Sequence, residues 1–232
     1  MIDYGRFEAL TFDCYGTLID WETGIAAAAR GLMGEPLAGR SDDELLAAFA
    51  AVEHEAEVPY RRYREVLALC FRRIGERFGI PVDDAQATAF AGSVGEWPPF
   101  PDSTPALRRL QGRFTLAVLT NCDDDLFARS EARLQVKFDH VITAEQARSY
   151  KPDQRNFQLA HERVGVPPGR ILHVAQSLYH DHVPAKRLGM TTVWINRRAG
   201  KGGGGGATPP ADATPDAVFP DLASFAAAAT AG

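Results

Sequence analysis

The sequence predicts an α/β fold in which a parallel sheet, covered by helices on both faces, is interrupted once by a helical insertion. Two observations support this fold class. Short apolar runs alternate with helical patterns along most of the 232 residues, as expected of strand–helix–strand units. Residues 21–95, by contrast, show helical patterns and no convincing strand. We therefore expect a core formed by residues 1–20 and 96–232 and a cap formed by residues 21–95.

Each expected strand is a short apolar run that ends in polar or small residues. These runs are residues 7–12, 114–119, 140–143, 171–175 and 191–195, with a weaker run at 217–219. The helical patterns between them cover residues 103–111, 123–134, 154–164 and 179–188, and a further helix follows the last run. Because strands alternate with helices, we expect the strands to run parallel. The glycine-rich residues 200–215 are expected to form a flexible surface loop.

The cap is expected to consist of amphipathic helices. Ser41 and Glu44 form a capping-box signature at the start of a helix over residues 45–57, and Pro59 ends that pattern. A second helix has an apolar stripe at helical spacing, formed by Leu67, Cys70, Phe71, Ile74 and Phe78. An insertion after the first strand would stand over the carboxyl ends of the strands, which is the place for a lid. Extra packing is the alternative role.

Composition and charge exclude several classes of function. The net charge of −5 and the pI of about 5.7 argue against nucleic acid or an anionic membrane as a partner. No apolar stretch approaches about 18 residues, and residues 1–6 lack the apolar segment of a secretory signal. The three cysteines are scattered without CxxC spacing, so we expect neither a disulfide framework nor a zinc site. These features favour a cytoplasmic protein.

Polar side chains follow several of the expected strands. In open parallel sheets, ligands bind in the crevice outside the carboxyl ends of the strands, so these side chains are candidates for a common site. They are Asp13 and Thr17 after the first strand, Thr120 and Asn121 after the second, Lys151 before a helix, and Gln176, Ser177 and Asp181 after residues 171–175. A single aspartate after a strand is weak evidence. An ordered set of four such positions is much stronger.

This ordered set resembles the motifs of the haloacid dehalogenase-like hydrolase superfamily, and within it those of the 2-haloacid dehalogenases. The resemblance spans residues 7–196 and is carried by residues 13–18 (DCYGTL), 119–121 (LTN), 150–153 (YKPD) and 173–177 (HVAQS), with Asp181 and Gly189. It implies a Rossmann-like sheet, a helical cap inserted after the first motif, and covalent catalysis by the first aspartate on a small-molecule substrate. Dimers are common in this family, so a homodimer is also an expectation.

The resemblance implies a two-step displacement that needs no cofactor. The Asp13 carboxylate attacks C2 of a short 2-haloacid and expels halide; water then attacks the carbonyl carbon of Asp13 and releases a 2-hydroxy acid inverted at C2. Lys151 would lower the Asp13 pKa, and Asp181 would orient or deprotonate the water. The carboxylates and the substrate would be held by Thr17, Thr120, Asn121 and Ser177.

Two positions distinguish this sequence from phosphatases of the same superfamily. Those enzymes carry a second aspartate two residues after the nucleophile and bind Mg²⁺ partly through a fourth-motif acid. Here Tyr15 and Gln176 stand at these positions, which leaves Asp13 and Asp181 as candidate ligands for a hard cation. Tyr15 would instead form an aromatic wall beside a carbon–halogen centre. A Mg²⁺-dependent phosphatase and a non-catalytic binding protein of this fold are the alternatives, and an intact Asp13, Lys151 and Asp181 argue against the second.

The sequence departs from the dehalogenases around the substrate. Those enzymes place a cap arginine over the substrate, and the nearest candidates here are Arg61 and Arg62. Phe157 and Ser177 replace a tyrosine and an asparagine of the family pattern, and Tyr179 is a candidate aromatic wall residue. These differences leave open whether the preferred substrate is a 2-haloacid.

Two further groups of residues near the motifs are expected to be structural. Cys14 and Cys122 each follow a motif residue and are expected to be small buried side chains rather than nucleophiles. Asp123, Asp124 and Asp125 are expected to cap the helix that follows them, with negative charge at its positive end.

Overall fold

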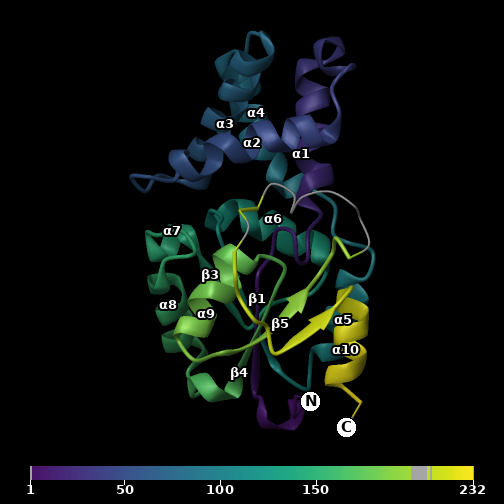
Figure 1. The fold of residues 1–232 in the computed structure, drawn as a ribbon, viewed down its shortest axis with the longest axis vertical. Helices are drawn as coiled ribbons and strands as arrows, with labels where there is room; N and C mark the ends of the chain where they lie inside the picture. Colours follow the sequence, from purple (N-terminus) through teal and green to yellow (C-terminus); the bar gives the residue numbers. More distant parts are fainter. Residues whose placement is uncertain (1, 200–207, 210, 232) are drawn as a thin grey trace.

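The computed structural model describes residues 2–199, 208–209 and 211–231. Its core is a six-stranded sheet of order β3-β2-β1-β4-β5-β6, in which every neighbouring pair is parallel (Figure 1). The strands are β1 Ala9–Phe12, β2 Thr115–Thr120, β3 His140–Thr143, β4 Ile171–Ala175, β5 Thr191–Ile195 and β6 Ala217–Phe219. The predicted α/β fold class is confirmed. Of the predicted glycine-rich loop, residues 200–207 and 210 lie outside the described residues.

The first strand is shorter than predicted at its start. Tyr4–Arg6 form a 3-10 helix, and the amide of Phe7 donates to the carbonyl of Tyr4 at 3.2 Å to close it. Phe7 follows this turn with an extended backbone and a buried side chain, and the ladder with β2 and β4 begins at Ala9.

Helices cover both faces of the sheet. One face carries α8 Gln154–Val164 and α9 Val183–Arg187, and the other carries α5 Ser103–Leu110, α6 Asp124–Leu134 and α10 Leu222–Ala229, while the short α7 Ala144–Ala147 precedes α8. Successive residues of β1 alternate between the two apolar clusters, with Ala9 under α8 and Leu10 under α5 and α10. Among the helices in the described part of the chain, none has the length and apolar character needed to cross a membrane.

The helix predicted at residues 179–188 has an irregular start. Leu178–His182 form a π-helical turn before α9 begins. Ser177 caps this turn, because its Oγ accepts a hydrogen bond from the amide of His180 at 2.9 Å. Such wide turns often occur at functional sites, and this one carries Asp181.

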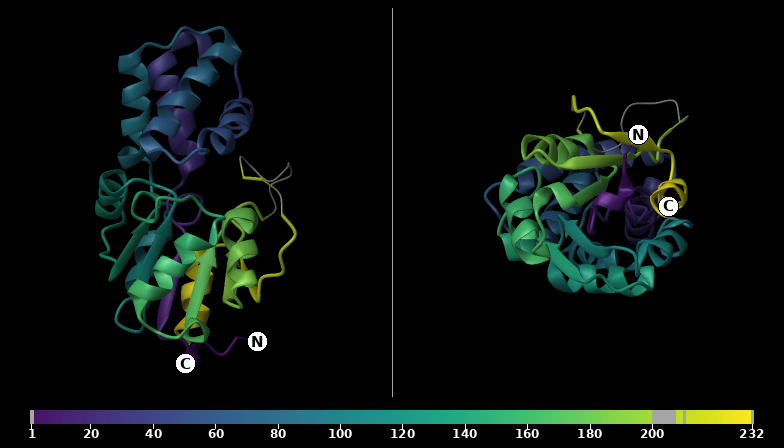
Figure 2. Two further views of the ribbon diagram at one scale, coloured as in Figure 1. Left: turned by 90° about the vertical axis from the view of Figure 1, so that its left-hand side faces the viewer. Right: turned by 90° about the horizontal axis from the view of Figure 1, so that it is seen from below.

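The inserted residues form a helical unit that stands above the sheet (Figure 2). Its helices are α1 Trp21–Met33, α2 Asp42–Ala56, α3 Tyr63–Phe78 and α4 Asp84–Gly92. Residues 21–95 contain no strand, and the predicted capping box at Ser41 and Glu44 is present at the start of α2. That residues 21–95 act as a unit separate from residues 1–20 and 96–232 stays a prediction.

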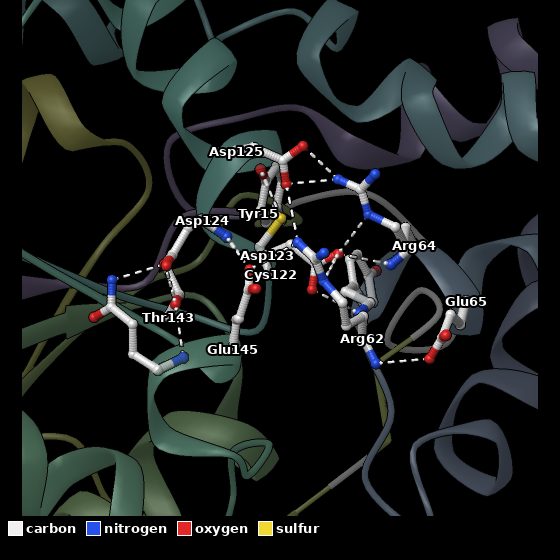
Figure 3. A network of polar contacts seen from close by, with 12 residues as sticks. Tyr15, Arg62, Arg64, Glu65, Cys122, Asp123, Asp124, Asp125, Thr143 and Glu145 are labelled. Atoms are coloured by element: carbon white, nitrogen blue, oxygen red, sulfur yellow. Dashed lines mark hydrogen bonds and ion pairs between the residues drawn. The ribbon is translucent and has the colours of Figure 1, made fainter.

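A network of polar contacts joins the cap to the core (Figure 3). The Asp123 carboxylate accepts hydrogen bonds from the amides of Tyr63 at 2.8 Å and Arg64 at 3.1 Å, the first residues of α3. The Arg64 guanidinium also contacts Asp123 and pairs with Asp125. Asp123 thus caps a helix of the cap.

This finding corrects the expectation that the aspartate run caps the helix that follows it. Asp123 does occupy the N-cap position of α6, but its side chain makes no capping hydrogen bond to α6. The amide of Asp124 at the start of α6 donates to Glu145 at 3.0 Å instead. The carboxylate of Asp123 is instead taken up by two amides at the start of α3, which have no acceptor within their own helix, and by the guanidinium of Arg64.

Candidate active site

A buried ion cluster lies where β1 and β4 end. The ammonium of Lys151 donates to Asp13 Oδ1 at 2.8 Å, to Asp181 Oδ1 at 2.7 Å and to the carbonyl of Leu119 at 2.9 Å. The side chains of Lys151, Asp13 and Asp181 are 2%, 9% and 1% exposed. An ammonium group has three N–H donors, so all the donors of Lys151 are used within the protein.

The local structure around Asp13 orients its carboxylate. Gly16 has φ +93°, a conformation that favours glycine, and it turns the chain back after β1. Thr17 then lies one turn beyond Asp13; its hydroxyl donates to Asp13 Oδ2 at 2.6 Å and accepts from the amide of Gln176 at 2.9 Å. Thr17 therefore links the end of β1 to the end of β4 and fixes the second oxygen of Asp13.

Asn121 positions Lys151. Its side-chain oxygen accepts from the amide of Lys151 at 2.7 Å, and its side-chain nitrogen donates to the carbonyl of Lys151 at 3.1 Å. This two-point contact holds the backbone of Lys151 beside the end of β2. Asn121 thus holds the backbone of Lys151, and the second N–H of its amide makes no hydrogen bond to a described residue, so this donor remains for a ligand in the cavity that Asn121 lines.

Asp181 has one engaged and one free oxygen. Its Oδ1 accepts from Lys151 and lies 3.1 Å from Nε2 of His173, whose Nδ1 lies 2.9 Å from the hydroxyl of Thr11. Its Oδ2 is buried and has no hydrogen-bond partner among the described residues. Asp181 lines the cavity described below, so Oδ2 is available to a water or substrate group.

The cluster perturbs the pKa values of its members in different directions. Burial raises the pKa of Asp13 above its usual range, and the attraction of Lys151 only partly offsets this effect. Burial also tends to raise the pKa of Asp181. Lys151 and the hydrogen bond from His173 outweigh this effect, so the Asp181 pKa is lowered. Burial lowers the pKa of Lys151, yet the two carboxylates reverse this and raise it. Lys151 is therefore a permanent cation, and the expected net lowering of the Asp13 pKa is not found.

A cavity of about 60 Å³ opens onto this cluster. Asp13, Lys151 and Asp181 form its floor, Tyr15 and Trp21 contribute aromatic surface, and Glu53 and Glu57 reach it from the cap. Asn121, Ser177 and His180 also line it. The cavity thus lies between the carboxyl ends of the strands and the cap.

Tyr15 has no part in proton transfer in this arrangement. Its hydroxyl lies 2.9 Å from Ser130 Oγ, and its ring lies edge-on to Trp97 with centroids 5.7 Å apart. Burial raises the Tyr15 pKa well above its usual value. The ring therefore offers an apolar wall to the cavity, and the hydroxyl remains protonated.

The structure does not bring four of the sequence-predicted substrate residues to the cavity. Arg62 pairs with Glu145 at 3.0 Å and with Asp125 at 3.3 Å, in the cap–core network of Figure 3. Arg61 meets the core through its backbone, since its carbonyl accepts from the hydroxyl of Tyr150 at 2.9 Å. Neither arginine lines the cavity.

The other two are Thr120 and Tyr179. Thr120 is buried and its hydroxyl has no partner among the described residues, but it does not line the cavity. Tyr179 lies against His54 and His180, with ring centroids 6.2 and 4.9 Å away; it does not line this cavity, but it lines an adjoining pocket that Lys151 and Glu57 also line. Cys14 and Cys122 are buried free thiols, as expected, and burial raises the Cys122 pKa to about 12.

Sequence reasoning missed several residues of the site, including Trp21 and Tyr63, which line the cavity, as well as one histidine and two glutamates. His173 belongs to a recognised motif and interrupts an apolar strand, which is a signal for a buried polar contact, but it was given no role. Glu53 and Glu57 lie on α2 and its C-cap in a charged run that is typical of a solvated helix end. No sequence pattern distinguishes these two glutamates from exposed ones.

The fold and this cluster define a class: α/β proteins with a strand-end aspartate, a lysine and a second aspartate beneath a helical cap. The family model of haloacid dehalogenase-like hydrolases matches residues 7–187. The chain belongs to this family and is a hydrolase.

Relatives within the family differ in the reactions for which they are named. The chain is 26% identical to (S)-2-haloacid dehalogenase H-109 of Pseudomonas putida, over 87% of this chain and 91% of the relative. It is 29% identical to 5-amino-6-(5-phospho-D-ribitylamino)uracil phosphatase YigB of Escherichia coli (strain K12), over 84% of this chain and 86% of the relative. A structure of L-2-haloacid dehalogenase from Xanthobacter autotrophicus with chloropropionic acid covalently bound shares the fold, with a TM-score of 0.79 and 22% identity over 95% of this chain and 97% of the other.

Proposed function

We propose that the protein hydrolyses a carbon–halogen bond of a short organic substrate through an ester on Asp13, without a metal cofactor. The observation that carries this proposal is the cluster in which one lysine binds both Asp13 and Asp181, beside Tyr15 and Gln176. Relatives named as 2-haloacid dehalogenases support the bond type. The small cavity favours a substrate with few heavy atoms.

In the first step a carboxylate oxygen of Asp13 attacks the carbon that bears the halogen. A carbon–oxygen bond forms, the carbon–halogen bond breaks, and the halide leaves with the bonding electrons. A halide needs no proton to leave, so this reaction does not require an acid at the position of Tyr15. Thr17 and Lys151 hold the two carboxylate oxygens in place for the attack.

In the second step water attacks the carbonyl carbon of Asp13. The free Oδ2 of Asp181 accepts a hydrogen bond from this water and orients it. Lys151 stabilises the negative charge that develops on the Asp13 oxygen. The bond between the carbonyl carbon and the substrate oxygen then breaks, one proton of the water goes to the alcohol product, the other is released to solvent, and the Asp13 carboxylate is restored.

The placement of Lys151 supports a reaction without Mg²⁺. The Lys151 ammonium lies 2.8 and 2.7 Å from oxygens of Asp13 and Asp181, and so already supplies the positive charge that a divalent cation would supply between these carboxylates. Among the described residues, no group of three or more histidine, cysteine or acidic side chains is placed to hold a metal ion. We propose that the enzyme works in the cytoplasm on a small molecule, and that residues 21–95 cover the site.

Halide release tests the proposed function. We expect chloride from at least one of chloroacetate, 2-chloropropionate, 2-chloroacetamide and 2-chloroethylamine, at a rate that EDTA leaves unchanged. The same preparation should not hydrolyse p-nitrophenyl phosphate with added Mg²⁺. Chelator-sensitive phosphatase activity without halide release would establish the phosphatase alternative. If no substrate of either kind turned over, the non-catalytic alternative would replace ours.

The pH dependence of turnover offers a second check. Asp13 attacks only as a carboxylate, and burial raises its pKa. We therefore expect kcat/KM to rise with pH along a limb centred above the ordinary aspartate pKa of about 3.9. Asp181, whose pKa is lowered, is already ionised in that range. Initial rates of halide release across this range check the position of the limb, and a limb at or below the ordinary value would contradict the assignment.

A further inference from the structure

We propose that Glu57, together with Glu53, binds a primary ammonium group of the substrate, so that the preferred substrate is a short halogenated amine rather than a 2-haloacid. This inference rests on the proposed function for the reaction, and it concerns the group beside the reacting carbon. It follows from an unpartnered buried carboxyl group, the charge of the cavity, and the helix end that carries the pair.

Glu57 is buried without a protein partner. It is 8% exposed, lines the cavity, and forms no hydrogen bond through its carboxyl group with any described residue. Glu53 lies four residues earlier, on the same face of α2, and one of its oxygens accepts from the hydroxyl of Tyr63 at 2.8 Å. The Glu57 oxygens are not among the fully enclosed polar atoms that lack a partner, and Glu57 lines the cavity, so its carboxyl group is accessible to a donor that enters the cavity.

The cavity has no free positive group for a substrate carboxylate. Among the described residues that line it, Lys151 is the only permanent cation, and its three donors are used by Asp13, Asp181 and Leu119. Burial lowers the pKa of His180 to about 4, so this histidine is neutral near pH 7. A substrate carboxylate would add a negative charge to a cavity that already holds four acidic side chains.

A cation in the cavity would stabilise the ionised form of the two glutamates. Burial raises the pKa of Glu57 to about 9, and the neighbouring Glu53 adds to this shift while Lys151 opposes it. Burial likewise raises the pKa of Glu53 to about 7. Both lie at the C-terminal end of α2, where the helix carbonyls also favour a positive charge. An ammonium group would ionise Glu57 and release its proton.

Three unreactive ligands of matched size separate the possible substrate groups. Ethanolamine, glycolamide and glycolate share a hydroxymethyl group, which is joined to an ammonium-bearing methylene, a carboxamide or a carboxylate, respectively. Calorimetry of the wild-type protein at pH 7.5 should show ethanolamine bound about tenfold or more tighter than glycolate, which corresponds to about 1.4 kcal/mol. Repeating the titration in two buffers of different ionisation enthalpy should show proton release with ethanolamine.

Variants of α2 test the residues. Glu57→Gln should weaken ethanolamine binding by tenfold or more and abolish the proton release, and Glu53→Gln should give a smaller loss. Glu55→Gln, at an exposed position of the same helix, is the matched control and should bind like wild type. Thermal unfolding of each variant confirms that it is folded.

Several outcomes would overturn the inference. Tighter binding of glycolate than of ethanolamine would show that a protonated Glu57 donates to a carboxylate. Equal loss in Glu55→Gln, or no binding of any of the three ligands, would remove the assigned role. Halide release without ethanolamine binding would retain the proposed function and reject this inference. Ethanolamine binding without halide release, from 2-chloroethylamine or any other substrate tested, would retain the ammonium site and reject the proposed reaction, and with it the halogenated amine as substrate.

Discussion

Replacing Asp13 with asparagine should lower kcat by on the order of 10⁴-fold or more, because the neutral carboxamide cannot attack carbon. The fold should persist, since asparagine has the same shape and Lys151 keeps its contacts with Asp181 and Leu119. Halide release measures the first effect, and a denaturant unfolding curve measures the second. Wild-type turnover by Asp13→Asn would exclude Asp13 as the nucleophile.

A matched control and an isotope experiment sharpen this test. Asp221 caps α10 by accepting from the amide of Ser224 at 2.7 Å, and asparagine caps helices equally well, so Asp221→Asn should change neither rate nor stability. In a single turnover in heavy-oxygen water, the label should enter Asp13 of the wild-type protein and not the product. Label in the product alone would mean that water attacks the substrate directly.

Replacing Lys151 with methionine should give the largest loss of stability, about 3–5 kcal/mol near neutral pH, because two buried carboxylates lose their cation. In the variant the pKa values of Asp13 and Asp181 should both lie above their unfolded values, so stability is lost as pH rises through them. The difference from wild type should therefore shrink as the pH falls. Urea unfolding of both proteins at pH 5 and at about pH 7.5 measures the loss of stability and its dependence on pH.

A surface lysine provides the control for this substitution. Lys186 pairs with Asp216, and their side chains are 30% and 37% exposed. Lys186→Met should therefore cost no more than about 1 kcal/mol and show little dependence on pH. If the two substitutions cost the same, Lys151 would not be the counter-ion of a buried pair, and turnover in Lys151→Met should then be near wild type.

The fold was predictable because local patterns and global topology agree in this chain. The apolar runs at residues 171–175 and 191–195 coincide with β4 and β5, since buried parallel strands read as short continuous apolar segments. Strand order, in contrast, depends on which helix covers which face, and no local pattern encodes it. The π-helical turn at Leu178–His182 could not be anticipated from periodicity alone.

The centre of the site was predictable for a related reason. Parallel strands deliver their carboxyl ends to one edge of the sheet, so Asp13 and Asp181 had to approach one another once their strands were assigned. The structure adds that Lys151 lies between them and that Thr17 holds the second Asp13 oxygen. Their catalytic roles remain proposals until the substitutions above are made.

The cap side of the site was not predictable. Which residues of a helix face the core depends on how the cap rests on the sheet, and this is set by long-range contacts such as that between Asp123 and α3. Arg61 and Arg62 are the arginines nearest the connection between two cap helices, where the dehalogenases place theirs, yet the chain turns Arg62 toward Glu145. The buried Glu53 and Glu57 are of the same residue type as solvated glutamates nearby, so the sequence does not distinguish them.

The contact of Asp123 with α3 limits how freely the cap could be exchanged between proteins. A graft of residues 21–95 onto a core without an acceptor at this place would leave the amides of Tyr63 and Arg64 without their carboxylate. In the grafted protein, α3 would lose part of its first turn, and an ion pair between cap and core would also be lost. Cap and core of this chain are therefore joined parts that must vary together, and are not interchangeable modules.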